Sequence, residues 1–323
     1  MAKIKLLICG GTGFIGRNLL EHFSQSGQFE IAATWHRTKP QAEAAVRWIE
    51  ADLTQAADVD RAVRGQDIIL HAAATTSGAK DILSKPYIHV TDNAVMSALL
   101  FRACLEHKVK HVVFLSCTVM YRPLGRPVRE EDFDGHITEN YFGAGWTKVY
   151  NEKMCEFYAR TGPTRYSVLR HSNIYGPHDK FDLEKSHVFG ATMTKVMTTR
   201  EGDRLVVWGD GSDERDFLYV EDLMEAVAAL IERQKTPFEL LNVGAGRSYS
   251  VKSLVAEMLA VSGRKLEVEY DVSKPSIGFK LAVNVEKIQK LYGWQARTSL
   301  KEGIQKTLAW YRQHVLPRQP SVS

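Results

Sequence analysis

The sequence predicts an α/β protein in which a doubly wound parallel sheet is followed by a smaller C-terminal substrate-binding lobe. Short apolar runs recur through the first half of the chain, at residues 4–9, 30–34, 67–73, 111–115 and 166–170. Segments in which apolar residues have a helical spacing separate these runs, at 17–26, 92–106 and 147–160. Strands that alternate with helices in this way are typical of a parallel sheet covered on both faces.

The first apolar run leads into the turn Gly10-Gly11-Thr12-Gly13-Phe14-Ile15-Gly16 and then into a helical segment. Gly10, Gly13 and Gly16 allow a tight turn, a close approach of the backbone to a pyrophosphate, and close packing of the helix on the strand. Free N–H groups at the start of the helix, around Phe14 and Ile15, would face the phosphate charge. Because a strand precedes the glycines and a helix follows them, the turn predicts a dinucleotide site.

The end of the second predicted strand indicates which dinucleotide binds. It reads Thr34-Trp35-His36-Arg37-Thr38-Lys39, without a carboxylate to hold a ribose 2′-hydroxyl. Arg37, with Lys39 or His36, offers positive charge to a 2′-phosphate instead. We therefore predict NADP, with NAD as the alternative cofactor and a solvated basic turn as the competing interpretation.

Two further strand ends are predicted to lie against the cofactor. Asp52, followed by Leu53, is placed to cap a turn or to contact the adenine, and Ala72 and Ala73 are small enough for a cofactor to lie against them. Both stretches are also ordinary sequences for the end of a strand.

The alternation of strands and helices loosens after Gly176, and a last helical segment spans 299–314. We therefore predict a nucleotide-binding domain over residues 1–176 and a mainly substrate-binding lobe over 177–323, from which some segments return to the first domain.

The composition narrows the class of function. The chain has 323 residues, and 42 Lys and Arg against 38 Asp and Glu give a formal net charge of +4, which favours neither nucleic-acid nor membrane binding. The four cysteines have no pairing or metal-ligand spacing, so no metal is expected. Without a signal-peptide pattern or a long apolar run, we expect a cytoplasmic location.

Several motifs together resemble the extended short-chain dehydrogenase/reductase family, whose members are largely nucleotide-sugar epimerases, dehydratases and reductases. Besides the glycine turn, they are the run FLSCTVMY at 114–121, Lys148, the run RHSNIYGP at 170–177 and the run RDFLYVED at 215–222. The stretches 175–181 and 186–188 are most similar to the GDP-4-keto-6-deoxymannose epimerase/reductase branch. The resemblance covers nearly the whole chain and implies a Rossmann-type fold.

The resemblance implies a tyrosine that acts as acid and base, and a lysine four residues later that lowers its pKa and binds the nicotinamide ribose. Lys148 matches the lysine, but position 144 is alanine, and a methyl group cannot exchange protons. Three explanations are open. Ala144 is an engineered replacement, or another group such as Tyr141 takes over, or the protein no longer transfers hydride.

Two more catalytic positions are altered or isolated. Where relatives place a hydroxyl that binds the substrate oxygen, this chain has Cys117, next to Thr118. A thiol is a weaker hydrogen-bond donor than a hydroxyl but a stronger acid. An equally open alternative is that Cys117 is a buried residue that only packs. His187 matches a histidine that works with a cysteine in epimerisation. The position of that cysteine is Val119 here, so His187 is expected to act as a single base or to bind the sugar.

The resemblance also implies contacts farther along the chain. The residues concerned are His171 for the cofactor and Asn173, Val207, Arg215 and Lys280 for the base and diphosphate of the substrate. A salt bridge from Arg215 to Asp213 or Asp222 is the competing interpretation for that cation.

These features predict an NADP-dependent reductase or epimerase/reductase acting at C4 of a nucleotide-diphosphate sugar, most closely a GDP-linked 4-keto-6-deoxy sugar. A nucleotide-sugar epimerase or dehydratase that does not consume its NAD(P) is the second interpretation, and a catalytically silent nucleotide-binding protein is the third. Family members commonly dimerise through two helices per subunit, so we expect a homodimer formed by segments 92–106 and 148–158.

Overall fold

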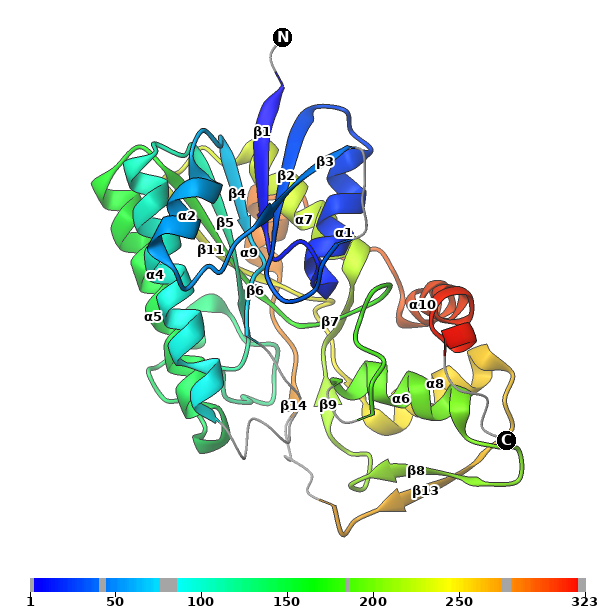
Figure 1. Ribbon diagram of the computed structural model, residues 1–323. Coiled ribbons are helices and arrows are strands. Elements are labelled where there is room, and N and C mark those ends of the chain that lie inside the picture. Colours follow the sequence, from blue (N-terminus) through cyan, green and yellow to red (C-terminus); the bar gives the residue numbers. More distant parts are fainter. Residues whose placement is uncertain (1–2, 41–44, 76–85, 184–185, 275–279, 319–323) are drawn as a thin grey trace.

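The central layer is a sheet of seven strands in the order β11-β6-β5-β4-β1-β2-β3 (Figure 1). Every neighbouring pair in it is parallel. The strands are β1 (Ile4–Cys9), β2 (Phe29–Trp35), β3 (Val46–Glu50), β4 (Ile68–His71), β5 (His111–Cys117), β6 (Arg165–His171) and β11 (Phe238–Val243). The strand order reverses between β1 and β4, and in such sheets ligands bind beyond the carboxyl ends at this point. The computed structural model describes residues 3–40, 45–75, 86–183, 186–274 and 280–318.

Helices cover both faces of the sheet, as the alternating sequence predicts. On one face lie α2 (Ala56–Val63), α4 (Thr91–Glu106) and α5 (Phe142–Thr161), and on the other α1 (Phe14–Ser24), α7 (Val220–Arg233) and α9 (Glu286–Tyr292) (Figure 1). Each layer encloses its own apolar core, so the middle strands are buried on both sides. This explains why β1, β4 and β5 read as nearly continuous apolar runs instead of alternating ones.

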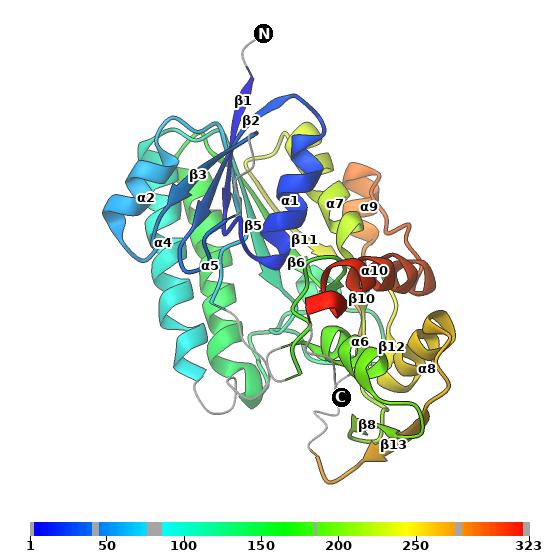
Figure 2. The same ribbon diagram turned by 45° about the vertical axis from the view of Figure 1, so that its right-hand side comes forward.

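A smaller lobe lies beyond the carboxyl edge of the sheet (Figure 2). Its third core is formed by α6 (Val188–Thr198), β8 (Arg204–Trp208), α8 (Val251–Ser262), β13 (Glu267–Asp271) and α10 (Leu300–His314). Two small sheets of short strands join it to the central sheet. One consists of β7 (Asn173–Tyr175) and β10 (Phe217–Tyr219), and the other has β9 (Glu214–Arg215) between β12 (Tyr249–Ser250) and β14 (Lys280–Leu281). Between these segments the chain returns to the sheet as α7, β11 and α9.

The predicted doubly wound α/β class is confirmed, but two helices begin earlier than the apolar spacing indicates. Helix α1 begins at Phe14 instead of residue 17, and α5 begins at Phe142 instead of residue 147. The first turn of α5 contains two glycines, Gly143 and Gly145. Because glycine has a low helix propensity, the sequence did not indicate that the helix begins here. As a result, position 144 lies on the helix and Tyr141 directly precedes it.

Candidate active site

The glycine turn joins β1 to α1 at the point where the strand order reverses. Gly10 has φ +84°, and its N–H donates to Thr34 Oγ1 at 2.9 Å. A Cβ on Gly10 would lie 2.8 Å from Ala73 Cα, and one on Gly16 only 2.1 Å from Gly10 O. The turn therefore packs as closely as the prediction requires, and it brings Ala72 and Ala73 at the end of β4 against the turn.

The amino end of α1 is open to a ligand. Gly13 is the N-cap residue and has no side chain to bond the first helical N–H groups, and no acidic residue lies in the first turn. Phe14 and Ile15, half-buried, begin the helix. Uncapped N–H groups and the positive end of a helix fit an anionic group such as a pyrophosphate.

The basic turn after β2 lies beside an acidic residue. His36 and Arg37 are exposed, and Asp52 has one carboxylate oxygen 3.9 Å from His36 Nε2. The other oxygen accepts from the N–H of Thr54 at 3.0 Å and from its hydroxyl at 2.7 Å. These bonds, with a smaller contribution from His36 and Arg37, lower the pKa of Asp52. Asp52 thus caps its own turn, followed by the buried Leu53.

Lys148 projects from α5 to the carboxyl end of β5. Its Nζ donates to Leu115 O at 3.0 Å and lies 4.9 Å from the centre of the Phe114 ring. Cys117, half-buried at the last position of β5, has a raised pKa because of burial, although the charge of Lys148 opposes the shift. Thr118 is buried next to it. Cys117 is therefore a neutral thiol close to an ammonium group.

Two histidines lie close to each other here, and one of them, His171, is near Lys148. His171, the last residue of β6, donates from Nδ1 to Ser172 O at 2.9 Å, and burial lowers its pKa to about 4, with Lys148 and His187 adding to the shift. His187 is the N-cap residue of α6. Its pKa is also lowered, by desolvation first and then by the positive charges of Lys180 and His89. The structure thus brings together Lys148, Cys117, His171 and His187, which are far apart in the sequence.

Tyr141 approaches the same site from the start of α5. It ends the short 3₁₀ helix Glu139–Tyr141 and is the N-cap residue of α5. Burial raises the pKa of its phenol, and the nearby groups that influence it are Arg215, Cys117 and Asp213. Tyr141 therefore lies near Cys117, against the lobe, and not in a separate loop.

The residues predicted to hold the substrate differ in their surroundings. Arg215 forms an ion pair with Asp213 at 3.3 Å, and both side chains are 14% exposed. The salt bridge to Asp213 that was the competing interpretation for Arg215 is therefore present. Lys280 is exposed and lies 3.4 Å from Glu214. Asn173, in β7, donates from Nδ2 to Asp216 O at 3.3 Å.

The side chain of Val207 is buried in the core of the lobe, whereas the next residue, Trp208, is 59% exposed. The ammonium groups of Lys195 and Lys274 lie over the Trp208 ring, 5.3 Å and 6.0 Å from its centre. Strand alternation separates the two neighbours, because successive side chains point to opposite faces. The two cations over the ring were not predicted from the sequence, because Lys195 lies on α6, far from Trp208 along the chain.

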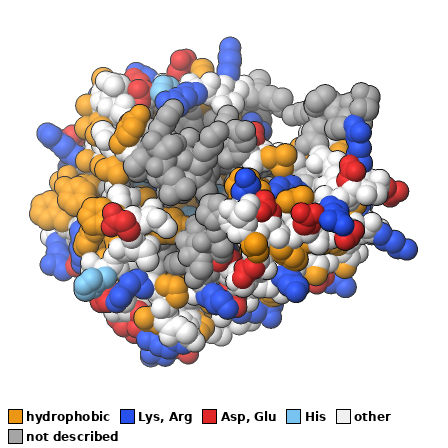
Figure 3. All heavy atoms as spheres, turned by 90° about the horizontal axis from the view of Figure 1, so that it is seen from below, with side chains coloured by type: hydrophobic (Ala, Val, Ile, Leu, Met, Phe, Trp, Pro, Cys, Tyr) orange, Lys and Arg blue, Asp and Glu red, His pale blue; other side chains and the backbone are white. Residues whose placement is uncertain are grey.

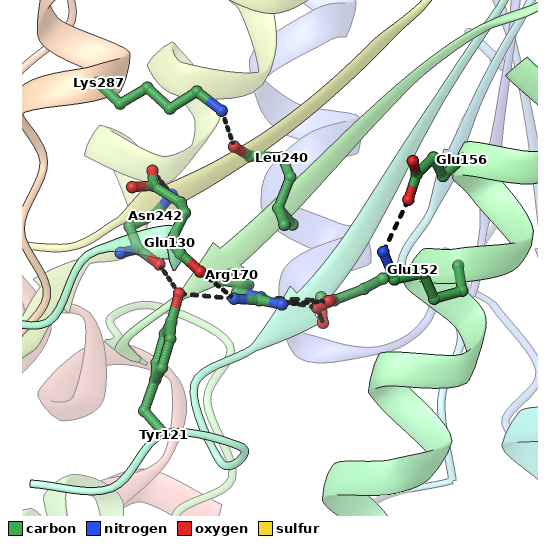
Figure 4. Close-up of polar contacts among 10 residues, drawn as sticks. Tyr121, Glu130, Glu152, Glu156, Arg170, Leu240, Asn242 and Lys287 are labelled. Atoms are coloured by element: carbon green, nitrogen blue, oxygen red, sulfur yellow. Dashed lines mark hydrogen bonds and ion pairs between the residues drawn. The ribbon is translucent and has the colours of Figure 1, made fainter. Parts of the chain in front are cut away.

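A buried polar network connects the central sheet to α5, around Arg170 (Figure 4). Arg170 and Glu152 form an ion pair at 2.7 Å, each side chain being 4% exposed, and Ser116 Oγ donates to Glu152 at 2.6 Å. The Arg170 guanidinium also donates to Tyr121 Oη at 2.8 Å, and that hydroxyl donates to Asn242 Oδ1 at 2.8 Å. The network connects β5, β6, β11 and α5.

Among the described residues, no group of three or more His, Cys, Asp or Glu side chains is arranged to hold a metal ion. Within the same part of the chain, no helix is long and apolar enough to cross a membrane.

The chain matches the model of the NAD dependent epimerase/dehydratase family over residues 6–244. It belongs to this family. The matched segment begins within β1 and ends just past β11, so it contains all of the sheet except the first two residues of β1, together with Lys148 and the glycine turn.

Relatives are similar over almost their full length. A GDP-L-fucose synthase from Azorhizobium caulinodans is 29% identical over 316 residues, which are 95% of this chain and 96% of that protein. A GDP-L-colitose synthase from Yersinia pseudotuberculosis is 25% identical, covering 95% of this chain and 98% of that protein. A dTDP-4-dehydro-6-deoxy-D-allose reductase from a Streptomyces species is 26% identical, covering 96% of each.

Solved structures of the family have the same fold. The UDP-glucose 4-epimerase of Thermotoga maritima, with UDP-glucose, superposes with a TM-score of 0.83 and 22% identity, over 96% of this chain and 99% of that one. The UDP-glucuronic acid 4-epimerase of Bacillus cereus, in complex with UDP-glucuronic acid and NAD, gives 0.83 and 23% over the same shares. These likenesses confirm the Rossmann-type architecture.

Proposed function

We propose that this protein is an NADP-dependent reductase, or epimerase/reductase, that acts at C4 of a GDP-linked 4-keto-6-deoxy sugar. The observation that carries the proposal is the group of Lys148, His171, His187 and Tyr141 at the carboxyl edge of the sheet, beside the open end of α1. The full-length relatives named for GDP-sugar and dTDP-keto-sugar reactions support the substrate class.

The basic turn after β2 supports NADP as the cofactor. His36 and Arg37 are exposed and so can contact a 2′-phosphate. One carboxylate oxygen of Asp52 accepts from the N–H of Thr54, and the other lies near His36. Lys148 would hold the nicotinamide ribose, with Ala72, Ala73 and His171 around the ring. The reduced nicotinamide, when bound, supplies the hydride.

Trp208, with Lys195 and Lys274, supports a nucleotide on the lobe side of the site. An exposed indole gives a stacking surface to a base, and two ammonium groups next to it suit an anionic diphosphate. Arg215 on β9 and Lys280 on β14, which pairs with β9, are two further cations on this side, each already near one carboxylate.

In the proposed reduction, the C4 carbonyl carbon receives a hydride and its oxygen takes a proton from a protein group. Lys148 stabilises the negative charge that develops on the oxygen. The candidate proton donors are Cys117, Thr118 and Tyr141. His187, with a lowered pKa, is a neutral base at pH 7 and would remove a proton from a carbon next to the carbonyl.

A second candidate is an epimerase that returns the hydride within one catalytic cycle, with its nicotinamide kept bound. It is favoured by the solved family structures, which include 4-epimerases in complex with NAD. Net consumption of NADPH distinguishes the two activities, because only the reductase oxidises one cofactor per product.

An apolar stripe on α4 and α5 supports a homodimer. Five exposed side chains contribute to it, Val95 on α4 and Phe142, Trp146, Tyr150 and Phe157 on α5. Figure 3 shows hydrophobic side chains gathered on the side of the molecule where these helices lie. The same stripe on a second copy would form a contact between two helix pairs.

The test is a mass-spectrometric assay of the purified protein with NADPH and a panel of GDP-, dTDP-, UDP- and CDP-linked 4-keto sugars in heavy water. A product two mass units heavier than the ketone, with NADPH oxidised in equal amount, supports reduction. Deuterium at ring carbons counts the epimerised centres. Cofactor binding without any conversion would refute both catalytic proposals.

A further inference from the structure

The segment of residues 177–182, which follows β7, has an unusual backbone at His178. Its φ is +66°, and the other non-glycine residue with a positive φ in the described part of the chain is Lys108. Lys108 lies just past the end of α4, where helices commonly finish in this conformation, whereas His178 follows a strand that ends at Tyr175. A residue that bears a Cβ is strained in this region and stays there only when its surroundings hold it.

Helix α1 is bonded to this segment at two consecutive residues. His178 Nε2 donates to Glu21 Oε1 at 2.6 Å, and the two side chains are 14% and 59% exposed. The buried side chain of Asn18, one turn earlier on α1, donates from Nδ2 to Phe14 O and to Pro177 O, each at 2.9 Å. The 177–182 segment therefore depends for its position on the same helix whose amino end is open to an anionic ligand.

Helix α10 contacts the same segment through aromatic rings. The His178 ring meets the Trp310 ring at an angle of 62°, with the ring centres 4.9 Å apart. Phe181 packs on Trp310 and Tyr311, at ring-centre distances of 5.9 Å and 5.0 Å. His178 thus joins a carboxylate on α1, in the nucleotide-binding domain, to an indole on α10, in the lobe.

The 177–182 segment packs directly on the start of α6, where His187 is the N-cap residue. Ser186 Oγ donates to Lys180 O, and it accepts from the N–H of Asp182 at 2.7 Å. A Cβ on Gly190, in the first turn of α6, would collide with Lys180 O. Lys180 is also close enough to His187 for its charge to help lower the pKa of that histidine. The position of the segment therefore determines where His187 lies.

The bond between His178 and Glu21 adds little to folding stability. Glu21 is mostly exposed, and such ion pairs contribute little because solvent screens them and two side chains lose freedom. The strained φ of His178 also works against stability. A contact that stores strain and stabilises the fold little, yet fixes the approach to a site, is typical of a residue that serves function.

We propose that His178 is a positioning residue, which joins α1 to α10 and so holds the 177–182 segment where His187 faces the sugar. This rests on the proposed function. His178 itself contacts neither the sugar nor the cofactor and transfers no proton. Because α1 also presents its amino end to the pyrophosphate, one helix sets the place of the cofactor and, through the segment, the place of His187. An error of about 1 Å in such a placement can cost about 10²-fold in rate.

The experiment compares wild type with His178→Gly, which removes the ring and relieves the backbone strain. The matched control is His107→Gly, because His107 forms the same kind of bond, to Asp60 at 2.6 Å, with 21% of its side chain exposed. A second pair tests the acceptor: Glu21→Ala removes it, and Glu21→Gln keeps an amide oxygen in its place. Tm, the dissociation constant for NADPH, and kcat/KM for the nucleotide sugar are measured for each protein.

We expect His178→Gly and Glu21→Ala to lose about 10- to 10²-fold in kcat/KM, because His187 is displaced. Binding of NADPH should stay within about twofold, and Tm within about 2 °C, because the bond contributes little to stability. Glu21→Gln and His107→Gly should stay within about threefold of wild type in kcat/KM, since each keeps the bond at His178.

The place of His187 is read separately, by NMR titration of histidines labelled with ¹³C at Cε1, with the His187 signal assigned by its absence in His187→Gln. We expect the pKa of His187 to lie below the ordinary 6.5 in wild type and in His107→Gly. In His178→Gly it should move toward 6.5, because a released segment takes Lys180 away and lets water reach the ring.

An unchanged pKa of His187 in His178→Gly, or equal losses of kcat/KM in His178→Gly and His107→Gly, would overturn the proposal. If His178→Gly melts far below wild type, the Glu21 pair decides instead, and equal rates of Glu21→Ala and Glu21→Gln then count against it. If wild type converts no nucleotide sugar, the proposed function fails, and the titration alone shows whether His178 positions His187.

Discussion

Replacing Arg170 by methionine removes the cation from a pair that is almost completely buried. Glu152, 4% exposed, then has no cation beside it and keeps the hydrogen bond from Ser116. Breaking one side of a buried ion pair costs about 3–5 kcal/mol. With an unfolding entropy of about 2.1 cal/mol/K per residue over 323 residues, this lowers Tm by about 4–7 °C.

Differential scanning calorimetry at pH 7 measures the shift, with Arg170→Met/Glu152→Gln as the matched variant. The amide of glutamine still accepts from Ser116 and leaves no charge buried, so the double variant should recover at least half of the lost Tm. If Arg170→Met melts within 1 °C of wild type, the pair does not hold these strands together. A double variant less stable than the single one would refute the argument from buried charge.

Four other outcomes are expected. Burial lowers the pKa of His111 to about 4 from its ordinary 6.5, so the unfolded chain takes up the proton first; the stability that denaturant unfolding shows lost between pH 7 and pH 5 should be smaller by about 2 kcal/mol in His111→Gln than in wild type, and the loss that remains comes from His171 and His71, whose pKa values burial also lowers. Arg37→Asp should raise KM for NADPH at least about tenfold and lower KM for NADH, and equal changes for both cofactors would argue against a phosphate contact. If the proposed homodimer forms, wild type should give a light-scattering mass near two 36.4 kDa chains and Phe157→Glu a mass near one. Lys148→Ala should lose about 10²–10³-fold in kcat/KM, and full turnover would remove Lys148 from the mechanism.

The features that follow from local sequence were predicted well. The glycine turn depends on contacts within a few residues, and Gly10 and Gly16 indeed lie where a Cβ would collide with the backbone. The sheet class follows from alternation along the chain in the same way. Lys148 was predicted from its motif; its Nζ reaches from α5 to Leu115 O in β5, and its catalytic role stays a prediction.

Features that depend on distant contacts could not be predicted. The edge strand β3 is short and carries Arg47, Trp48 and Glu50, so its apolar pattern is too weak to recognise without β2 beside it. The network around Arg170 joins residues from 116 to 242, and only the fold reveals that their polar atoms meet. The surroundings of Tyr141 depend on Arg215 from the other lobe.

Strand β11 lies late in the chain but pairs inside the central sheet, and this affects how the protein folds during synthesis. Until residue 243 has left the ribosome, β6 has an open edge of backbone donors and acceptors that β11 later pairs from Phe238 to Val243. Such an edge invites pairing with other chains. A fragment ending at Gly176 should therefore aggregate, and any attempt to express the nucleotide-binding half alone would need β11 joined back to β6 by a redesigned connection.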